Sequence, residues 1–167
     1  MTRIGLISDT HGFFDDKIFD YFKDCDEVWH AGDFGNGIVQ KFKEFKSLKG
    51  VFGNIDDQQI LNEFPGQLVF MCEEVKVIIR HIGGYPPRYN PETKKELFIH
   101  QPQLFISGHS HILKIIFDEK LQCLYMNPGA AGKQGWHKMR TIIRFLIDGK
   151  EIKNCEVIEL GKKGSEV

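Results

Sequence analysis

The segment RIGLISDTH (residues 3–11) predicts a buried strand at Arg3–Asp9, and it ends in an aspartate and a histidine. Ile18 and Phe22 then follow with the spacing of one helical face, and a second apolar run occupies Glu27–Asp33. A strand, a helix and a strand in succession are typical of parallel strands joined by a right-handed crossover. The first part of the chain therefore predicts an α/β fold.

The rest of the chain repeats this unit once and then changes to hairpins. A third strand is predicted at Leu48–Asn54, and the prolines between Pro86 and Pro91 predict a loop. The other predicted elements are a helix presenting Ile38, Val39, Phe42 and Phe45, a hairpin of Leu68–Met71 and Val75–Ile79, a helix at Glu92–His100, strands at Gln103–His109, Leu113–Phe117 and Leu121–Met126, and a hairpin of Thr141–Ile147 and Ile152–Ile158.

Size and composition indicate one globular unit. A chain of 167 residues, 41% hydrophobic and 27% charged, has room for a single well-buried domain. We assign residues 1–160 to that domain and expect the polar, glycine-containing segment 161–167 to fray. The formal net charge of -1 gives no support to nucleic-acid binding through the phosphate backbone.

The cysteines and the apolar runs bear on the cellular compartment. Cys25, Cys72, Cys123 and Cys155 are widely separated, which argues against a zinc site built from thiolates. Met1 leads directly into the first predicted strand, and no apolar run approaches the length of a membrane helix. We therefore expect a cytoplasmic protein with free thiols, no signal peptide and no membrane partner.

Polar side chains gather where the predicted strands end. In an open α/β sheet, ligands bind outside the carboxyl ends of the strands. Oxygen and nitrogen donors without thiolates suit first-row divalent metals, and seven donors exceed what one ion takes from a protein. The sequence therefore predicts two metal ions, the arrangement that phosphoester chemistry exploits. The seven candidate ligands are Asp9, His11, Asp33, Asn54, His81, His109 and His111.

These residues carry a family resemblance. The motifs Asp9-x-His11, Gly32-Asp33, Gly53-Asn54, His81 and Gly108-His109-x-His111 resemble, in this order, the calcineurin-like metallophosphoesterases. The resemblance extends from residue 3 to about Gly129. The length and the segment Asn127-Pro128-Gly129-Ala130 are most similar to the small single-domain phosphodiesterases of bacteria and archaea.

The resemblance implies the fold and the ligand assignment. It implies a four-layer α-β-β-α sandwich, with two mixed β-sheets flanked by helices. It assigns Asp9, His11 and His111 to one metal and Asn54, His81 and His109 to the other, with Asp33 bridging the two. Asn54 and Asp33 are the expected catalytic residues, and the amide of Asn54 is also a candidate donor to a phosphate oxygen of the substrate. Manganese is the first choice of metal, with iron, nickel and zinc left open.

The implied reaction is hydrolysis of a phosphodiester by a hydroxide that the two metals activate. Many phosphatases of this superfamily have a histidine directly after Gly-Asn, whereas this sequence has Ile55, which cannot donate a proton. The small phosphodiesterases have a similar Gly-Asn-x-Asp pattern, so the difference favours them over a phosphomonoesterase. The proton for the leaving group would come from Asp56, His137 or water.

Other polar residues are predicted near the site, and most of them also have a purely structural explanation. His30 either orients Asp33 or is a core histidine satisfied by the backbone, and Asp56 is expected to support the ligands. Asn36, Arg88 and His137 are candidate substrate contacts, although loop composition explains them nearly as well. Tyr85 and Tyr89 are further candidates for the pocket lining, and His100 is expected to end a helix.

Two classes of function remain open. The first is the phosphodiesterase, whose substrate would be a small-molecule or nucleotide-type phosphodiester. The second is a protein-interaction scaffold of the same fold, with or without bound metal. The retromer scaffold subunit of eukaryotes is similar to the same small branch and is a scaffold of this kind. The seven intact ligand positions favour the enzyme. The sequence leaves a homodimer or a higher homo-oligomer open.

Overall fold

The first sheet contains the predicted parallel strands. The computed structural model describes residues 1–164. Within them, one five-stranded sheet has the order β12-β11-β1-β2-β3. In this sheet β1, β2 and β3 are parallel, β11 is antiparallel to β1, and β12 is antiparallel to β11. These strands are β1 (Thr2–Ile7), β2 (Glu27–His30), β3 (Ser47–Gly50), β11 (Met139–Asp148) and β12 (Glu151–Lys162). The crossover topology predicted from the strand and helix order is confirmed.

The second sheet has the order β4-β5-β8-β10-β9. Its three central strands are parallel, and each edge strand pairs antiparallel with its neighbour. The strands are β4 (Gln67–Cys72), β5 (Val75–Arg80), β8 (Leu104–Ile106), β9 (Leu113–Asp118) and β10 (Cys123–Pro128). Two short strands, β6 (Gly84–Tyr85) and β7 (Arg88–Tyr89), form a separate pair.

The main core lies between the two sheets. Side chains of a strand point alternately to its two faces, so Ile4 and Leu6 of β1 enter this core whereas Ile7 packs on the other side. Trp29 of β2 is fully buried there and meets Phe70 and Phe145 edge to face, with ring centroids 5.0 and 5.7 Å apart. Burial of these large side chains supplies much of the driving force that joins the sheets.

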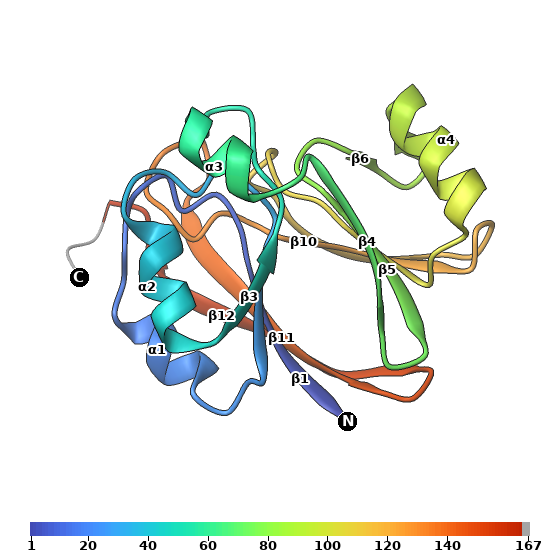
Figure 1. Ribbon diagram of the computed structural model, residues 1–167, viewed down its shortest axis with the longest axis horizontal. Coiled ribbons are helices and arrows are strands. Elements are labelled where there is room, and N and C mark those ends of the chain that lie inside the picture. The colour runs from blue at the N-terminus through green and yellow to red at the C-terminus, as the bar shows by residue number, and fades with distance from the viewer. Residues whose placement is uncertain (165–167) are drawn as a thin grey trace.

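Helices cover the two outer faces. In α1 (Lys17–Phe22) and α2 (Ile38–Phe45), Phe22 and Phe42 are buried against the first sheet, and in α4 (Pro91–His100), Leu97 is buried against the second. Figure 1 shows α1 and α2 beside the first sheet and α4 at the far side of the second. The predicted four-layer sandwich of two mixed sheets and flanking helices is therefore confirmed.

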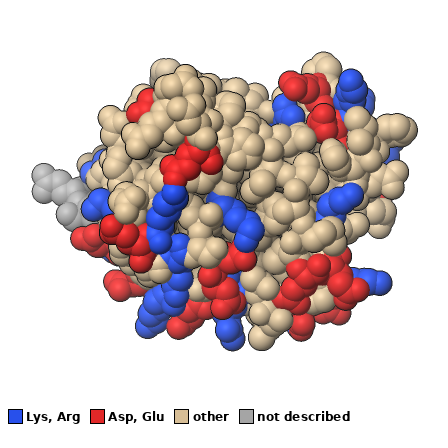
Figure 2. All heavy atoms as spheres, viewed as in Figure 1, with Lys and Arg blue, Asp and Glu red and all other residues tan. Residues whose placement is uncertain are grey.

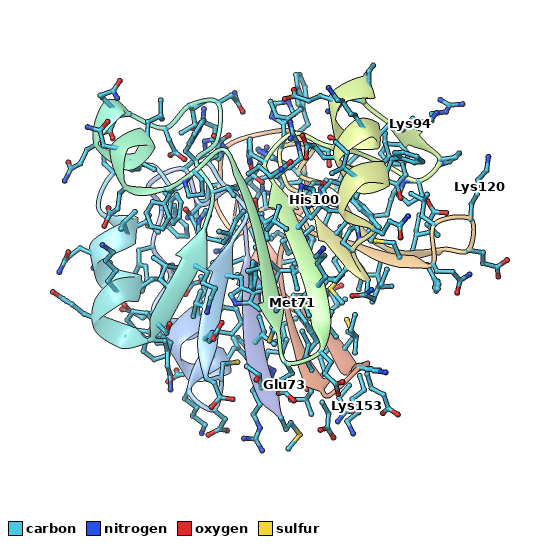
Figure 3. The ribbon with its side chains drawn as sticks, turned by 45° about the vertical axis from the view of Figure 1, so that its right-hand side comes forward. Met71, Glu73, Lys94, His100, Lys120 and Lys153 are labelled. Atoms are coloured by element: carbon cyan, nitrogen blue, oxygen red, sulfur yellow. The ribbon has the colours of Figure 1, made fainter. Side chains whose placement is uncertain are left out.

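The fourth helix begins and ends as its sequence predicts. Asn90 caps it by accepting a hydrogen bond from the backbone N–H of Thr93 at 2.8 Å, and Pro91 occupies the first turn. His100 is its last residue, at the end of the helix in Figure 3, and its ring lies 3.2 Å from the Glu96 carboxylate. The prediction that His100 ends a helix is confirmed.

Several predicted boundaries are wrong. The strands of the site end earlier than predicted, β1 at Ile7 and β2 at His30, so the candidate ligands lie in the loops that follow. The helix α3 (Gln58–Glu63) was not predicted. The last strand continues to Lys162, into the segment expected to fray; the end of that segment, 165–167, lies outside the described residues.

Three further observations concern the helices, the cysteines and the surface charge. None of the helices in residues 1–164 combines the length and the apolar character needed to cross a bilayer. The four cysteines are free, three of them buried and Cys155 exposed. On the face in Figure 2, basic and acidic side chains intermingle at the lower left, and a group of acidic side chains lies at the lower right.

Candidate metal centre

The candidate ligands follow the carboxyl ends of strands from both sheets. Asp9 and His11 follow β1, Asp33 follows β2, and His109 and His111 follow β8. All five have a positive φ, between 45° and 69°, which is uncommon for residues other than glycine and marks sharp turns. Each strand therefore turns abruptly at the edge of the sandwich and directs a polar side chain into the space between the sheet ends.

Two glycines allow these loops to approach one another closely. A Cβ atom on Gly53 would lie 2.0 Å from Oδ1 of Asp33, and one on Gly108 would lie 2.2 Å from Oγ of Ser8. No real side chain tolerates such distances, so both positions require glycine. The glycines that precede Asn54 and His109 in the sequence motifs are thus explained by packing at the site.

The first cluster consists of Asp9, His11 and His111. Nε2 of His111 lies 3.2 Å from Oδ1 of Asp9 and 3.4 Å from Nε2 of His11. The other carboxylate oxygen of Asp9, Oδ2, accepts hydrogen bonds from the Ser8 hydroxyl at 2.6 Å and from the backbone N–H of His109 at 3.0 Å. Oδ1 of Asp9 is buried without a hydrogen-bond partner and faces the histidine rings.

The second cluster consists of Asp33, His81 and His109, with Asn54 beside them. Oδ1 of Asn54 lies 3.0 Å from Nε2 of His81 and 3.0 Å from Nδ1 of His109. Nδ1 of His81 lies 2.8 Å from the carbonyl oxygen of Ala31. When the N–H of His81 donates to that carbonyl, Nε2 presents its lone pair to the cluster, as metal-binding histidines commonly do.

Asp33 lies between the two clusters. Its Oδ2 is 3.6 Å from Nε2 of His11 in the first cluster and 3.1 Å from Nε2 of His81 in the second. Its Oδ1 accepts a hydrogen bond from the backbone N–H of Ile55 at 3.0 Å, which fixes the carboxylate. One oxygen of Asp33 is therefore anchored by the protein, and the other faces both groups of ligands.

The electrostatics keep both carboxylates ionised. Burial on its own would raise the pKa of Asp9, but the nearby His11 and His111 outweigh it and hold this pKa well below the ordinary value. Burial likewise opposes ionisation of Asp33, whose pKa is nevertheless lowered, chiefly by His81. The pKa of His81 is raised because the attraction of Asp33 and Asp9 exceeds the effect of its burial.

The two clusters fit a pair of divalent cations. Each offers one carboxylate oxygen and two imidazole nitrogens within 4.8 Å of one another, a donor set suited to first-row metals. The buried, unpartnered Oδ1 of Asp9 is costly without a positive charge beside it. A cation would satisfy this oxygen, and Oδ2 of Asp33 would reach either cluster.

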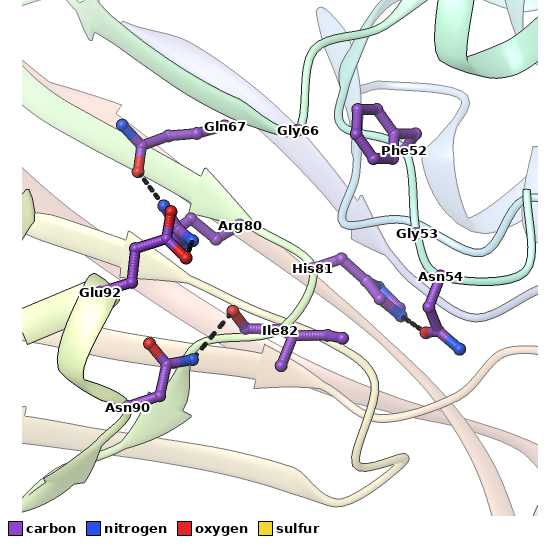
Figure 4. Close-up of a pocket in the computed structure, with 10 residues that line it drawn as sticks. All are labelled: Phe52, Gly53, Asn54, Gly66, Gln67, Arg80, His81, Ile82, Asn90 and Glu92. Atoms are coloured by element: carbon purple, nitrogen blue, oxygen red, sulfur yellow. Dashed lines mark hydrogen bonds and ion pairs between the residues drawn. The ribbon is translucent and has the colours of Figure 1, made fainter.

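Two hollows flank the clusters. The first, which we call the Arg80 hollow, has a volume of about 550 Å³ and is shown in Figure 4; the second, of about 400 Å³, lies beside His11 and Asn36. The Arg80 hollow is lined by Phe52, Asn54, Gln67, Arg80, Ile82 and Glu92, among others. Both hollows open next to candidate ligands and offer space for the groups attached to a bound phosphate.

Comparison with known proteins agrees with this geometry. The family described as the calcineurin-like phosphoesterase superfamily domain matches residues 2–150. This chain belongs to the calcineurin-like phosphoesterase superfamily. The family predicted from the five motifs is thus confirmed.

Several known proteins are similar over nearly the whole chain. A Methanothermobacter thermautotrophicus protein named "Probable metallophosphoesterase" is 29% identical over 165 residues, which span 95% of this chain and 92% of that protein. A structure described as a novel archaeal phosphodiesterase has a TM-score of 0.73 at 21% identity, covering 95% and 99% of the two chains. Vps29 of Entamoeba histolytica, in complex with zinc, has a TM-score of 0.72 at 16% identity, covering 94% and 98%. Both of these solved structures share the fold of this chain.

The structure brings all seven predicted ligands to one place. Of the three other residues predicted to contact the substrate, two lie nearby and one lies apart. Asn36 lines the hollow beside His11. The ring of His137 packs edge to face on His111 with a centroid distance of 5.1 Å. Arg88 is exposed on β7 and lines neither hollow, so its prediction as a phosphate contact is not supported by its position.

The predicted pocket tyrosines are engaged elsewhere. The hydroxyl of Tyr89 donates to Asp118 at 2.7 Å, and the ring of Tyr85 lies under the ammonium group of Lys114 at 3.6 Å. Both contacts stabilise the second sheet and the β6–β7 pair. The sequence suggested these tyrosines because they occupy a loop after a ligand, but that loop leads away from the clusters.

The two predicted supporting residues act on the backbone. Asp56 accepts hydrogen bonds from the backbone N–H groups of Asp33 at 3.0 Å, Gly53 at 2.8 Å and Gly35 at 3.1 Å. His30 bonds the Thr10 hydroxyl at 3.0 Å and accepts from the backbone N–H of Gly32 at 3.1 Å. His30 has no hydrogen bond to the Asp33 carboxylate, so its position fits the alternative of a core histidine.

Two features of the site region were missed from the sequence. Ser8, which donates a hydrogen bond to Asp9, falls within the strand predicted at Arg3–Asp9, although its place beside a ligand is a usable signal. Asp15 and Arg140 form a fully buried ion pair with a distance of 2.8 Å that ties the loop after β1 to β11. These two residues are 125 positions apart, and no local pattern connects them.

Proposed function

We propose that this protein is a metal-dependent phosphodiesterase. The observation that carries the proposal is the position of Asp33, whose Oδ2 lies 3.6 and 3.1 Å from histidines of two separate clusters. Two cation sites that share one carboxylate suit in-line displacement at phosphorus, because both the attacking and the leaving oxygen need charge stabilisation. An archaeal protein of this fold is described as a phosphodiesterase, so the fold accommodates that activity.

The residues of the chain would hold and orient the reacting groups. Asp9, His11 and His111 would bind one metal, His81, His109 and Asn54 the other, and Asp33 would bind both. Oδ1 of Asn54 already faces the two histidines, which leaves its amide nitrogen to donate a hydrogen bond to a phosphate oxygen. The side chain of Asn54 is exposed and therefore within reach of a substrate.

The metals would supply the positive charge. When bound, two divalent cations neutralise phosphate oxygens and lower the pKa of a water that they share. Manganese is the first metal to test, with iron, nickel and zinc as alternatives, because imidazole and carboxylate ligands accept all four. Zinc is the ion in the Entamoeba histolytica Vps29 complex.

The source of the proton for the leaving group bears on whether the substrate is a diester or a monoester. Ile55, which follows Asn54, offers no proton and is 47% exposed. Both oxygens of Asp56 accept backbone N–H groups, and the pKa of His137 is lowered by burial. These observations argue against a strong protein acid at the site, so water would protonate the leaving group. Diesters with good leaving groups are the substrates that such a site suits best.

The proposal is tested by hydrolysis of two chromogenic esters. Protein stripped of metal is refilled in turn with manganese, nickel, zinc and magnesium and assayed with bis(p-nitrophenyl) phosphate and p-nitrophenyl phosphate. We expect metal-dependent cleavage of the diester that disappears in Asp33→Ala. Asp118→Ala, which removes an aspartate far from the clusters, is the control and should retain activity. Preference for the monoester would replace the proposal with a phosphomonoesterase.

A second candidate function, a protein-interaction module, is favoured by the edge strand β9. Four of its apolar side chains are more than a third exposed, namely Leu113, Ile115, Ile116 and Phe117. Exposed apolar side chains on an unpaired sheet edge are typical of protein contacts. If the protein binds two metals but hydrolyses neither ester, the interaction module becomes the better description.

A further inference from the structure

We propose that the Arg80 hollow binds the nucleoside substituent of the phosphodiester substrate. This inference rests on the proposed function and adds to it a substrate class and the residues that select it. The hollow begins at Asn54 and His81 and extends past the end of β5 to the first turn of α4 (Figure 4). A phosphate bound at the metal clusters would therefore place one of its substituents there.

The polar part of the hollow offers a donor and an acceptor side by side. Nη1 of Arg80 donates to Gln67 at 2.6 Å, and Nη2 lies 3.2 Å from Oε2 of Glu92. Each of these nitrogens carries a second hydrogen, and the other carboxylate oxygen of Glu92 remains to accept. The Glu92 side chain is 75% exposed, whereas that of Arg80 is only 14% exposed and is fixed by its partners.

The charge balance of the hollow favours a neutral polar group. Arg80 is already paired with Glu92, so a second phosphate would have to displace a carboxylate to gain the guanidinium. A nucleobase avoids this cost, because its edge presents an acceptor oxygen next to an N–H donor, as thymine and guanine do. Arg80 would donate to the base oxygen while Glu92 accepts from the base N–H.

The apolar part of the hollow suits the flat faces of a base. Phe52 is half-buried at one side, and Ile82, 45% exposed, lies at the other. A Cβ atom on Gly66 would lie 2.9 Å from the tip of the Phe52 ring, so glycine at this position leaves room for the ring at the wall of the hollow. Aromatic side chains stack on bases, and a volume of about 550 Å³ accommodates a nucleoside.

The experiment compares two diesters with the same leaving group and the same charge. These are the p-nitrophenyl ester of thymidine 5′-phosphate and methyl p-nitrophenyl phosphate, assayed with the metal-loaded protein. We expect kcat/KM for the thymidine ester to exceed that for the methyl ester by at least about tenfold, mainly through KM, as one base-stacking contact provides. Arg80→Met and Glu92→Ala should each remove most of this preference, and Glu92→Ala changes a side chain that is 75% exposed.

Arg144→Met is the matched control. Like Arg80, Arg144 donates to an amide oxygen, here the backbone carbonyl of Tyr21 at 2.8 Å, and to an exposed glutamate, Glu156 at 2.9 Å, but it lies against α1 on the first sheet. This variant should keep the full preference for the thymidine ester. Trp136→Ala tests a competing location, since Trp136 is fully exposed in the loop beside His137. Loss of the preference in Trp136→Ala but not in Arg80→Met would overturn the assignment.

Calorimetry separates this inference from the proposed function. Thymidine 5′-phosphate should bind the metal-loaded protein at least about tenfold more tightly than methyl phosphate, and Arg80→Met should abolish the difference. If the methyl ester is hydrolysed but the thymidine group brings no gain in binding or in kcat/KM, the inference is wrong and the phosphodiesterase stands. If neither ester is hydrolysed but the Arg80-dependent gain in binding is present, the hollow stands and the phosphodiesterase does not.

Discussion

Asp9 follows the last residue of β1, and Glu73 contacts Thr2 at the first residue of β1; the carboxylates of these two acidic residues are satisfied in opposite ways. Glu73 lies at the β4–β5 turn in the lower part of Figure 3; one of its oxygens accepts from the Thr2 hydroxyl at 2.7 Å and the other from the backbone N–H of Gly149 at 2.9 Å. Asp9 has one anchored oxygen and one buried oxygen without a partner. Both residues have positive φ angles, 53° for Asp9 and 51° for Glu73.

The comparison identifies what distinguishes a binding carboxylate from a structural one. Both residues have a strained backbone, so the positive φ alone does not mark a functional residue. The difference is the unsatisfied, buried oxygen of Asp9, since a folded protein keeps such a group only where something else compensates it. Substitutions at the two ends should therefore have opposite consequences for activity and stability.

The largest effect is expected for Asp9→Asn. The amide would remove the negative charge that faces His11 and His111, so the first metal would be lost together with several kcal/mol of transition-state stabilisation, a rate loss of roughly 10³-fold or more. Diester hydrolysis and the metal content of the purified variant are the measurements. Retention of two metals with wild-type activity would remove the contrast between Asp9 and Glu73.

Asp15→Ala should instead reduce stability. The Asp15–Arg140 pair is fully buried, and removal of one partner from such a pair leaves an uncompensated charge that costs about 3 to 5 kcal/mol. Urea unfolding of the metal-free protein measures this loss. The control is Lys153→Ala, which breaks the exposed contact of Lys153 with Asp148 at 3.0 Å and should cost much less stability. Equal losses in both variants would show that burial does not matter here.

His30 provides a smaller effect that depends on pH. Burial lowers the pKa of His30 to about 3, whereas the unfolded chain has the ordinary histidine value of about 6.5. The unfolded state therefore binds a proton that the folded state does not, and stability falls as pH falls below about 6.5. Between pH 7 and pH 5 this amounts to about 2 kcal/mol, at about 1.4 kcal/mol per pH unit.

The measurement is urea unfolding of the metal-free wild type and of His30→Gln at pH 7 and pH 5. His81, His109 and His137 titrate in both proteins, so the difference between the two isolates His30. The wild type should lose more stability on acidification than the variant. An identical loss in both would mean that His30 is protonated in the folded protein and that its bonds to Thr10 and Gly32 do not hold it neutral.

The order of the elements was predictable because each rests on a local pattern. The apolar runs and the helical spacing of Ile18 and Phe22 are properties of short windows, and the motif order gave the family. The strand ends were less predictable, since Asp9 and Asp33 follow apolar runs without a break in the sequence pattern. Helix α3 was missed because only six residues form it and Ile60 alone is buried in it.

The candidate site was predictable in its residues but not in its surroundings. The seven donors were found because each follows a strand, and parallel strands bring their carboxyl ends to one edge. The Arg80 hollow depends on Gln67, Arg80 and Glu92, which come from β4, β5 and α4. Their meeting is a product of tertiary packing, and the sequence instead suggested Arg88, which lies on the neighbouring β7 and lines neither hollow.

The smallest effect is expected for Glu73→Gln, the counterpart of Asp9→Asn at the other end of β1. Hydrogen bonds from Thr2 and Gly149 lower the pKa of Glu73 to about 2. Its contribution to stability is therefore complete above the unfolded pKa of about 4.3 and is lost as pH falls toward 2. The wild type should have a slightly higher Tm than the variant at pH 7, and the gap should close as the pH approaches 2. Diester hydrolysis should be unchanged, because both carboxylate oxygens of Glu73 accept hydrogen bonds within the fold and neither is available to a cation. A loss of metal or activity in Glu73→Gln would mean that the two ends of the strand are coupled, and partner satisfaction would then no longer separate structural from metal-binding carboxylates in this protein.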